Sequence, residues 1–432
     1  MRAIAMRAVG VDFGTTNSAL AVCDSADRAP ELALFEDSTG AREPTFRSLL
    51  YFEREEGGPL QELAGPDAIE GYLNADERGR LMQSLKSFLA ARDFSVTSVF
   101  GKPYRLEALI GLLLRTLRER AEQSVGELSG PIVAGRPVRF VSAQDAEDDA
   151  LALTRLRAAY FNAGFGPVEF EYEPVAAAYH YERDLDHDEL ILIADIGGGT
   201  SDFCLLRVGP SRKSRSAEES LLDTEGIALA GDAFDGRIVR HAVSPALGLG
   251  SKIQSPFGQE MDAPSWLYAH LERWHHVSFL RTPKSLQLLY DLCREAKHPE
   301  RFRAFRHLVE QNLGFALHRA VEHTKRTLSH ERSALLELAD GPLELHERVL
   351  SSDFSSWIWD DVEKIAGCVD RLLGRHGIAE AEIDRVFLTG GSSFVRAMRD
   401  LFTRRFGPDK IRTGAELTSV ASGLALRALE RR

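Results

Sequence analysis

Two segments of this 432-residue chain share one pattern, and that pattern constrains the fold more than any other feature of the sequence. Residues 8–22 read AVGVDFGTTNSALAV, and residues 190–208 read LILIADIGGGTSDFCLLRV. In each segment, β-branched and other apolar residues flank a turn of small residues, which predicts two strands joined as a hairpin. Because an internal repeat indicates related structural units, we expect two α/β lobes that face each other.

Each repeat has a companion segment that predicts the start of a helix. Glu173 opens one such segment, EPVAAAY, and residues 418–425 (TSVASGLA) form the other. We therefore predict a first lobe over residues 1–185 and a second lobe over residues 186–432. Residues of about 41–129 and about 236–329 differ in character and are expected to be insertions on the two lobes. Within the first insertion, Leu106–Val125 carries apolar residues at helical spacing.

Composition argues against several classes of protein. The net charge of −12 opposes a general surface for nucleic acid. No apolar run reaches the length of about 18 residues that crosses a bilayer, so no membrane span is expected. The cysteines, Cys23, Cys204, Cys293 and Cys368, show no paired spacing, which is typical of free thiols in a reducing cytoplasm. The histidines form no pattern of metal ligands.

The two small-residue turns are suited to a phosphate group, because backbone N–H groups can approach an anion closely there. Residues 14–17 (GTTN) and 197–200 (GGGT) follow Asp12 and Asp195, each expected at the end of a strand. A carboxylate beside phosphates is expected where it holds Mg²⁺ through water. One such turn would be weak evidence, but two turns headed by aspartate predict a nucleotide site. The GxxxxGK[ST] and strand–GxGxxG patterns are absent, so P-loop and Rossmann chemistry do not fit.

A third turn follows the apolar segment VFLT at residues 386–389 and begins with Gly390 and Gly391. It predicts another strand that ends in paired glycines. Two interpretations stay open at this point. A base or sugar could lie against the bare backbone, or the turn could be an ordinary junction between a strand and a helix.

Taken together, DFGTTNS, EPVAAA, DIGGGTSD and FLTGGSS resemble, in this order, the motifs of the actin-like ATPase superfamily. Within it they resemble the nucleotide-binding domain of the seventy-kilodalton heat-shock (DnaK-type) chaperones. Residues 226–235, GIALAGDAFD, resemble the GGxxFD segment of that family. The resemblance implies an α/β, two-lobed actin-like ATPase fold of duplicated ribonuclease-H-like domains, with a helical or mixed insertion on each lobe. It also implies ATP or ADP with Mg²⁺ in the cleft between the lobes, and K⁺ as a further candidate cation.

The resemblance also implies roles for individual residues, some of which have a plainer interpretation without it. Glu322, Lys325 and Ser329 would otherwise be the end of an amphipathic helix. The first phosphate loop would use Asp12, Gly14, Thr15, Thr16 and Asn17, and the second Asp195, Gly197, Gly198, Gly199 and Thr200. Asp12 and Asp195 would hold Mg²⁺ through water. The adenosine would contact Gly231, Glu322, Lys325, Ser329, Gly390, Gly391, Ser392 and Phe394.

For catalysis, Lys86 in the segment SLKSF matches a lysine that reaches the γ-phosphate, whereas alone it would be a lysine on a surface helix. Glu173, Asp202 or Thr200 would orient the attacking water, and which of them acts as the base is left open. The implied function is a slow ATPase with chaperone-like, nucleotide-gated lobe closure. An ATP-binding regulatory module without significant hydrolysis is the alternative, and a small-molecule kinase of the same superfamily is less favoured.

Three departures from the family pattern affect these expectations, and the smallest is Ser201, which replaces an aromatic residue in the second loop and changes the packing there. Phe394 stands where the family has an arginine over the adenine, and its ring could still stack on the base. No segment resembles the interdomain linker or the peptide-binding domain, as in the short YegD-like members. Their absence weakens the case for classical chaperoning of substrates, and the resemblance leaves a protein client, a co-chaperone or an exchange factor as candidate partners. In the second insertion, Trp266, Trp274 and Phe279 either pack in the core or form a surface for a partner.

Overall fold

The computed structural model describes residues 7–25, 28–36, 40–54, 58–74, 79–141, 143–182, 185–210, 220–254, 260–413 and 419–431. Contacts within the chain divide it into two units. Unit 1 comprises residues 1–228, 365–393 and 402–432, and unit 2 comprises residues 229–364 and 394–401. Among the described residues, no helix is both long enough and apolar enough to cross a membrane.

The first sheet of unit 1 is built around the hairpin expected over residues 8–22. Strand β1 (Ala8–Asp12) pairs antiparallel with β2 (Asn17–Cys23), which confirms that hairpin. On its other side β1 pairs parallel with β12 (Ile132–Arg136), and β12 pairs parallel with β13 (Val168–Tyr172). Two short strands, β3 (Glu31–Leu32) and β6 (Phe46–Arg47), add to β2.

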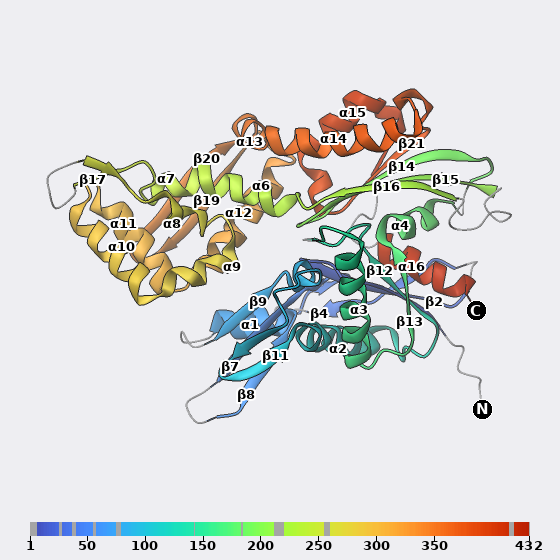
Figure 1. The fold of residues 1–432 in the computed structure, drawn as a ribbon, viewed down its shortest axis with the longest axis horizontal. Coiled ribbons are helices and arrows are strands. Elements are labelled where there is room, and N and C mark those ends of the chain that lie inside the picture. Colours follow the sequence, from blue (N-terminus) through green and yellow to red (C-terminus); the bar gives the residue numbers. More distant parts are fainter. Residues whose placement is uncertain are drawn as a thin grey trace. The chain divides into compact units, whose positions relative to one another are not determined.

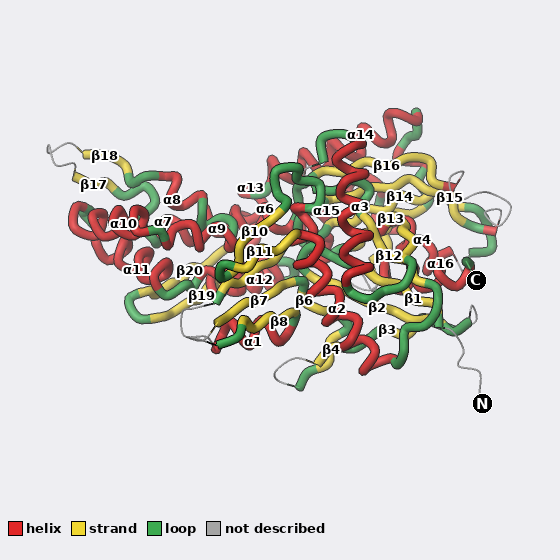
Figure 2. The backbone as a smooth tube through the Cα atoms, turned by 60° about the horizontal axis from the view of Figure 1, so that its bottom comes forward, coloured by secondary structure: helices red, strands yellow, loops and turns green. Residues whose placement is uncertain are grey.

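Helices α2 (Leu106–Val125) and α3 (Ala146–Asn162) cover one face of this sheet and lie side by side (Figures 1 and 2). The bounds of α2 are those predicted from its apolar spacing. One buried cluster joins Val9 and Val11 of β1 to Leu113 of α2 and Leu156 of α3. Because side chains alternate between the two faces of a strand, Val9 and Val11 of β1 both point toward the helices.

The second sheet of unit 1 is built around the other expected hairpin. Strand β14 (Glu189–Ile196) pairs antiparallel with β15 (Ser201–Val208), which confirms the prediction. The strand order is β16-β15-β14-β21-β22, with β16 (Leu221–Ile227) antiparallel to β15. Strands β21 (Arg385–Thr389) and β22 (Ile411–Thr413) run parallel to β14. The predicted third strand is therefore present.

Helix α4 (Glu173–Glu182) packs against both sheets and α16 (Ser419–Glu430) packs against the first, and both lie in segments where a helix was expected to begin. Val175 and Ala178 of α4 lie in one cluster with residues of β14 and β15. Ala176 lies in another cluster with Leu424 of α16 and residues of β1 and β12. The two helices cross very closely, because a Cβ on Gly423 would lie 1.7 Å from the Ala176 carbonyl oxygen.

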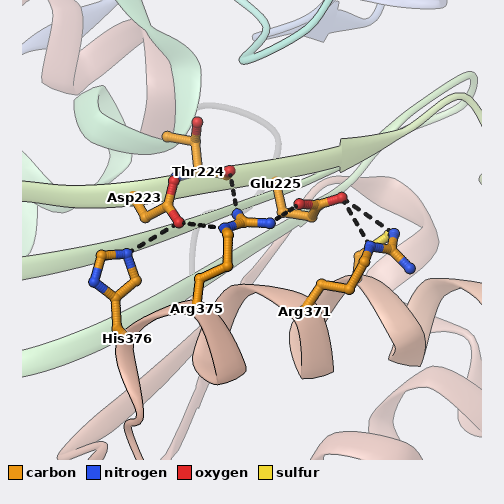
Figure 3. A network of polar contacts seen from close by, with 7 residues as sticks. Asp223, Thr224, Glu225, Arg371, Arg375 and His376 are labelled. Atoms are coloured by element: carbon orange, nitrogen blue, oxygen red, sulfur yellow. Dashed lines mark hydrogen bonds and ion pairs between the residues drawn. The ribbon is translucent and has the colours of Figure 1, made fainter.

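Helix α14 (Trp359–His376) holds the outer strand β16 through a network of charged side chains, which Figure 3 shows. Arg375 contacts Asp223 at 2.7 Å and Glu225 at 2.5 Å. Arg371 adds a second contact to Glu225 at 3.1 Å, and His376 lies 3.0 Å from Asp223. Exposed ion pairs are individually weak, but a network of this kind fixes the position of an edge strand. Its neighbour in the sheet, β15, carries part of the site.

Smaller elements complete unit 1. One three-stranded sheet has the order β8-β7-β9, and two further pairs of strands form hairpins. The bounds are β4 (Phe35–Glu36), β5 (Arg42–Glu43), β7 (Leu49–Arg54), β8 (Leu60–Ala64), β9 (Arg80–Gln83), β10 (Val96–Val99), β11 (Lys102–Arg105), α1 (Pro66–Asn74), η1 (Leu85–Phe88), η5 (Glu380–Glu382) and η7 (Pro408–Lys410). Two further elements, η6 (Gly391–Phe394) and α15 (Arg396–Phe406), have residues in both units.

Unit 2 is mainly helical, with a long hairpin of two strands (Figure 1). This agrees with the helical character expected for residues of about 236–329. The bounds are α6 (Gly231–Ile238), η3 (Val239–Val243), α7 (Ser244–Ala246), β17 (Lys252–Gln254), β18 (Glu260–Asp262), α8 (Ser265–Ala269), α9 (Trp274–Val277), η4 (Ser278–Arg281), α10 (Pro283–Glu295), α11 (Pro299–Glu310), α12 (Gly314–Leu328), β19 (Ser333–Asp340), β20 (Leu343–Leu350) and α13 (Ser351–Trp357).

The aromatic residues of the second insertion had two interpretations, and core packing is wrong for two of them. Trp266 is 47% exposed and Phe279 is 60% exposed. Their apolar neighbours Leu267 and Leu271 fill the core instead. The side chain of Trp274 lies outside the described part of the chain. The surface for a partner stays a prediction, as do the duplicated lobes and their bounds.

Candidate functional site

The first small-residue turn links Asp12, the last residue of β1, to Asn17, the first residue of β2. Gly14 is required inside it, because a Cβ at this position would lie 2.0 Å from the carbonyl oxygen of Asn17. The carbonyl oxygen of Thr16 accepts a hydrogen bond from the backbone N–H of Ser48 at 2.9 Å. The predicted phosphate loop is thus a tight and anchored turn.

The second turn places two carboxylates opposite each other. Asp195 of β14 pairs directly with Asp202 of β15, and the N–H of Gly197 closes the turn onto the carbonyl oxygen of Thr200 at 2.9 Å. Gly226 of β16, on the other side of Asp202, leaves room for its side chain, because a Cβ there would lie 2.9 Å from Oδ1.

The two turns meet at Gly199, together with a third segment. A Cβ on Gly199 would lie 3.7 Å from Cγ2 of Thr15 and 3.8 Å from Oγ of Ser87. Ser87 is the neighbour of Lys86 in the 3₁₀ turn η1. The structure therefore brings together both predicted phosphate loops and the segment of the predicted catalytic lysine.

Lys86 is buried, being only 6% exposed, so the alternative of a lysine on a surface helix is wrong. Its Nζ lies 2.6 Å from Oε1 of Glu173, the first residue of α4. Glu173 packs over Gly135 of β12, where a Cβ would lie 2.9 Å from its Cγ. Both partners of this ion pair are shielded from water, which makes their attraction stronger than at a surface.

The carboxylates around Lys86 crowd one another, and their pKa values shift accordingly. Burial first, and then repulsion by Glu173, raises the pKa of Asp12 well above its usual range, while Lys86 opposes the rise. The same causes raise the pKa of Asp195 to about 6 and the pKa of Asp202 well above normal. Burial alone would lower the pKa of Lys86, but attraction to Glu173 and Asp12 leaves it raised. The carboxyl groups of Asp12, Glu173, Asp195 and Asp202 thus share the single ammonium group of Lys86.

This donor set fits a hydrated magnesium ion. Oδ1 of Asp202 is buried and makes no hydrogen bond within the described residues. Carboxylate oxygens are the protein ligands that Mg²⁺ prefers, with much of its water shell kept. In the described part of the chain, no three His, Cys, Asp or Glu side chains are arranged to hold a metal ion directly. The fit thus rests on the charge and on the oxygen donors of the cluster.

The third turn joins the second one. Asp195 lies opposite Thr389 in the parallel pair β14–β21, and Ser392 donates a hydrogen bond through Oγ to the Gly197 carbonyl oxygen at 2.7 Å. Gly390 has a φ of +79°. A Cβ on it would lie 2.4 Å from the carbonyl oxygen of Ile196 and 2.6 Å from Oδ1 of Asp195. Backbone and side chain contacts thus both require glycine here.

Replacing Gly390 with alanine is therefore expected to lower the free energy of unfolding more than the same change at Gly377, which follows the last turn of α14. Gly377 also has a positive φ, of +62°, but no atom lies within 4 Å of its virtual Cβ. Gly377→Ala isolates the backbone strain, of about 1 kcal/mol, and Gly390→Ala adds steric overlap of about 1–3 kcal/mol. Urea denaturation of both variants measures the difference, and equal losses would show that the turn yields to the methyl group.

Unit 2 contains a second buried group of charges, on α6 and α12. Nζ of Lys325 lies 2.7 Å from Oδ2 of Asp235 and donates to the carbonyl oxygen of Gly231 at 3.5 Å. Burial raises the pKa of Asp235 to about 6, despite the attraction of Lys325. Glu322 lies one turn before Lys325 on α12. Its charge adds to the rise in the pKa of Asp235, whereas the charge of Lys325 opposes it. Of the residues expected around adenosine, this unit thus groups Gly231, Glu322 and Lys325.

The remaining predicted residues of this set lie at the ends of elements. Ser329 follows α12 and donates through Oγ to the carbonyl oxygen of Lys325 at 3.2 Å. Phe394 ends η6 and is half-buried. Gly391 and Gly198 are in the turns described above, with Gly391 exposed and Gly198 half-buried.

Two residues of these groups were missed from the sequence. Ser87 reaches the second turn, and only its position beside Lys86 could have indicated this. Asp235 pairs with Lys325 from 90 positions away. Asp235 ends the segment that resembles GGxxFD, but nothing in the sequence gave it a role or identified its partner.

Comparisons with known proteins extend the resemblance found in the motifs. No family model matches the chain. Over 439 aligned residues it is 25% identical to the chaperone protein DnaK from two strains of Thermus thermophilus, a match that covers 98% of this chain. The chain spans 60% of the length of these relatives. It is thus homologous over nearly its whole length to the heat-shock protein 70 (DnaK) chaperones, and this homology supports a nucleotide-binding domain of that type.

Proposed function

We propose that the chain binds ATP with its phosphates in the acidic cluster of unit 1 and hydrolyses it slowly to ADP and phosphate. The observation that carries the proposal is the buried ion pair of Lys86 and Glu173, beside the point where both glycine-rich turns meet at Gly199. An ammonium and two turns rich in backbone N–H groups are what a triphosphate requires. Homology to DnaK, a chaperone protein, supports the same conclusion.

Different residues of the cluster have different proposed roles in the transfer of the phosphoryl group to water. The N–H groups of the turns at residues 14–17 and 197–200 cradle the phosphates. Lys86 places its charge where negative charge develops on the transferred group. Glu173, Asp202 or Thr200 orients the attacking water. Magnesium, held through water by Asp12 and Asp195, would neutralise charge on the phosphates.

The base and sugar of ATP are proposed to contact Gly231, Glu322, Lys325, Ser329 and the turn Gly390–Ser392. Binding of the nucleotide would gate closure of the two lobes, so that the chain acts as a chaperone-like switch for a partner protein. A client, a co-chaperone or an exchange factor is the kind of partner proposed.

Single-turnover hydrolysis of Mg-ATP tests the proposal. We expect slow release of phosphate that does not depend on any added acceptor. Binding of ATP without turnover would replace the ATPase with the regulatory module. Turnover that rises only when sugars or carboxylic acids are added would instead identify a small-molecule kinase.

Phe394 is expected to contribute to base binding by stacking alone. Replacing it with alanine should weaken ATP binding by about 2- to 10-fold, which corresponds to the 0.5–1.5 kcal/mol of a typical aromatic contact. Phe161→Ala is the control, because Phe161 is 79% exposed on α3. Calorimetric titration measures both dissociation constants. Equal affinities of the two variants would remove Phe394 from the site.

A further inference from the structure

Arg155 is a buried cation on the apolar face of α3. It is only 8% exposed and shares that face with Ala152, Leu156 and Ala159. Burying a guanidinium group among apolar side chains is costly unless its charge and its donors are satisfied. Its contacts therefore show what holds it there.

The contacts of Arg155 lead to the segment of the candidate catalytic lysine. Its Nη1 donates to the carbonyl oxygens of Leu89 at 3.0 Å and Ala91 at 2.9 Å. Nε lies 3.6 Å from Oε1 of Glu107 on α2, which balances the charge. Leu89 in turn donates its backbone N–H to the carbonyl oxygen of Lys86 at 3.2 Å. Arg155 thus holds the chain that leaves η1, one hydrogen bond away from Lys86.

The same segment has a distinctive feature at each of its ends: an ion pair to α3 at Arg92 and an unusual backbone conformation at Ser84. Arg92 contacts Asp148 and lies 3.2 Å from Asp145, the N-cap of α3. At the other end, Ser84 has a φ of +56°, a conformation that non-glycine residues rarely adopt. Residues 84–92, called the strap below, are thus attached to α3 through Arg92 at the N-terminus of the helix and through the buried side chain of Arg155.

We propose that Arg155 is a positioning residue, which holds residues 84–92 on α3 so that Nζ of Lys86 sits at one point beside Glu173. The inference rests on the proposed ATP hydrolysis. Lysine carries its charge on a flexible four-carbon stem, so its position depends on the backbone beneath it. A displacement of about 1 Å at a charged group can lower a rate by about 10²-fold.

Arg155→Met tests this role and keeps much of the apolar volume of the side chain. We expect the single-turnover rate of ATP hydrolysis to fall by about 10- to 100-fold, while the dissociation constant of ATP changes by less than about 3-fold. Arg157→Met is the matched control on the same helix. Arg157 donates to the carbonyl oxygen of Val168 at 3.0 Å, away from the strap. The Arg157→Met protein should have a lower free energy of unfolding than wild type but the same single-turnover rate of ATP hydrolysis.

A double variant separates positioning from a general effect on the fold. If Arg155 acts through Lys86, then Lys86→Met combined with Arg155→Met should be no slower than Lys86→Met alone. If the double variant is slower than wild type by the product of the two single effects, the proposal is overturned. If Arg155→Met fails to fold, Arg155→Lys replaces it in the test, because lysine keeps the charge but has fewer N–H donors. The rate of ATP hydrolysis should then fall less than is expected for Arg155→Met. An unchanged rate there would overturn the proposal as well.

Hydrogen exchange gives a readout that needs no nucleotide. The backbone N–H groups of Leu89 and Ala91 bond within the strap. Arg155→Met should raise their exchange at least about 10-fold, and Arg157→Met should not. Faster exchange in a protein that does not hydrolyse ATP would refute the proposed function alone. Faster exchange with an unchanged rate of hydrolysis, or unchanged exchange, would refute the role of Arg155.

Discussion

Replacing Lys86 with methionine is expected to lower the single-turnover rate of ATP hydrolysis by about 10²- to 10³-fold, the range measured for the loss of one group that stabilises transition-state charge. The Nζ of Lys86 is the cation placed 2.6 Å from Glu173 within the cluster of acids. ATP binding should change less than the rate, because Lys86 is proposed to act where charge develops. Rapid-quench measurement of phosphate release gives the rate.

The matched variant for this change removes the partner as well. Lys86→Met alone leaves Glu173 buried without its counter-charge, and breaking one side of a buried pair costs about 3–5 kcal/mol. Lys86→Met with Glu173→Gln should restore most of that free energy of unfolding without restoring the rate. A double variant that regains both stability and hydrolysis would show that Lys86 serves the fold and not the reaction.

Replacing Asp195 with asparagine is expected to raise the free energy of unfolding of the nucleotide-free protein, by up to about 3 kcal/mol at pH 7.5. Burial, and then repulsion by Glu173, raises the pKa of Asp195 from 3.8 to about 6 in the folded protein. A shift of about 2 units corresponds to about 3 kcal/mol of unfavourable interaction for the ionised form. Asparagine removes that charge and keeps the size of the side chain.

The pH dependence of stability follows with a definite sign. The folded protein binds the Asp195 proton more tightly than the unfolded chain, so this proton stabilises the folded state at low pH. Its contribution is fully present below about pH 4 and is lost as the pH rises through about 6. The advantage of Asp195→Asn over wild type should therefore grow from pH 5 to pH 7.5. Urea midpoints at these pH values measure it.

The control is Asp149→Asn, also in unit 1. Asp149 contacts Arg136 and accepts a hydrogen bond from the N–H of Phe140, so its charge is compensated. Its replacement should destabilise the protein at pH 7.5. If Asp195→Asn lowers the free energy of unfolding at pH 7.5 as much as Asp149→Asn does, then repulsion among the buried acids does not destabilise the folded protein. In the presence of Mg-ATP, Asp195→Asn should instead be less stable than wild type, because the cluster then lacks a carboxylate that supports the cation.

The features that the sequence predicted correctly depend on neighbours along the chain. Gly14 is demanded by a turn a few residues long, and the bounds Leu106–Val125 follow from apolar spacing within one helix. Asp12 and Asp195 could be placed at strand ends for the same reason. These predictions needed only local geometry and the alternation of apolar residues.

What could not be predicted depends on contacts between distant residues. The pairs Lys86–Glu173 and Lys325–Asp235 join positions 87 and 90 residues apart. Neither partner signals the other in a single sequence. Arg155 left a weaker trace, as a cation on the mainly apolar buried face of α3. Its carbonyl partners have no signature at all, since every residue carries a backbone oxygen.

Calorimetric titration of the nucleotide-free protein with ATP, with and without Mg²⁺, tests the central claim most directly. The claim is that the acidic cluster around Lys86 and Glu173 receives the phosphates of a magnesium nucleotide. The account predicts one binding event whose affinity falls when Mg²⁺ is removed or when Asp12 is replaced with asparagine. Absence of ATP binding in the presence of Mg²⁺ would contradict it.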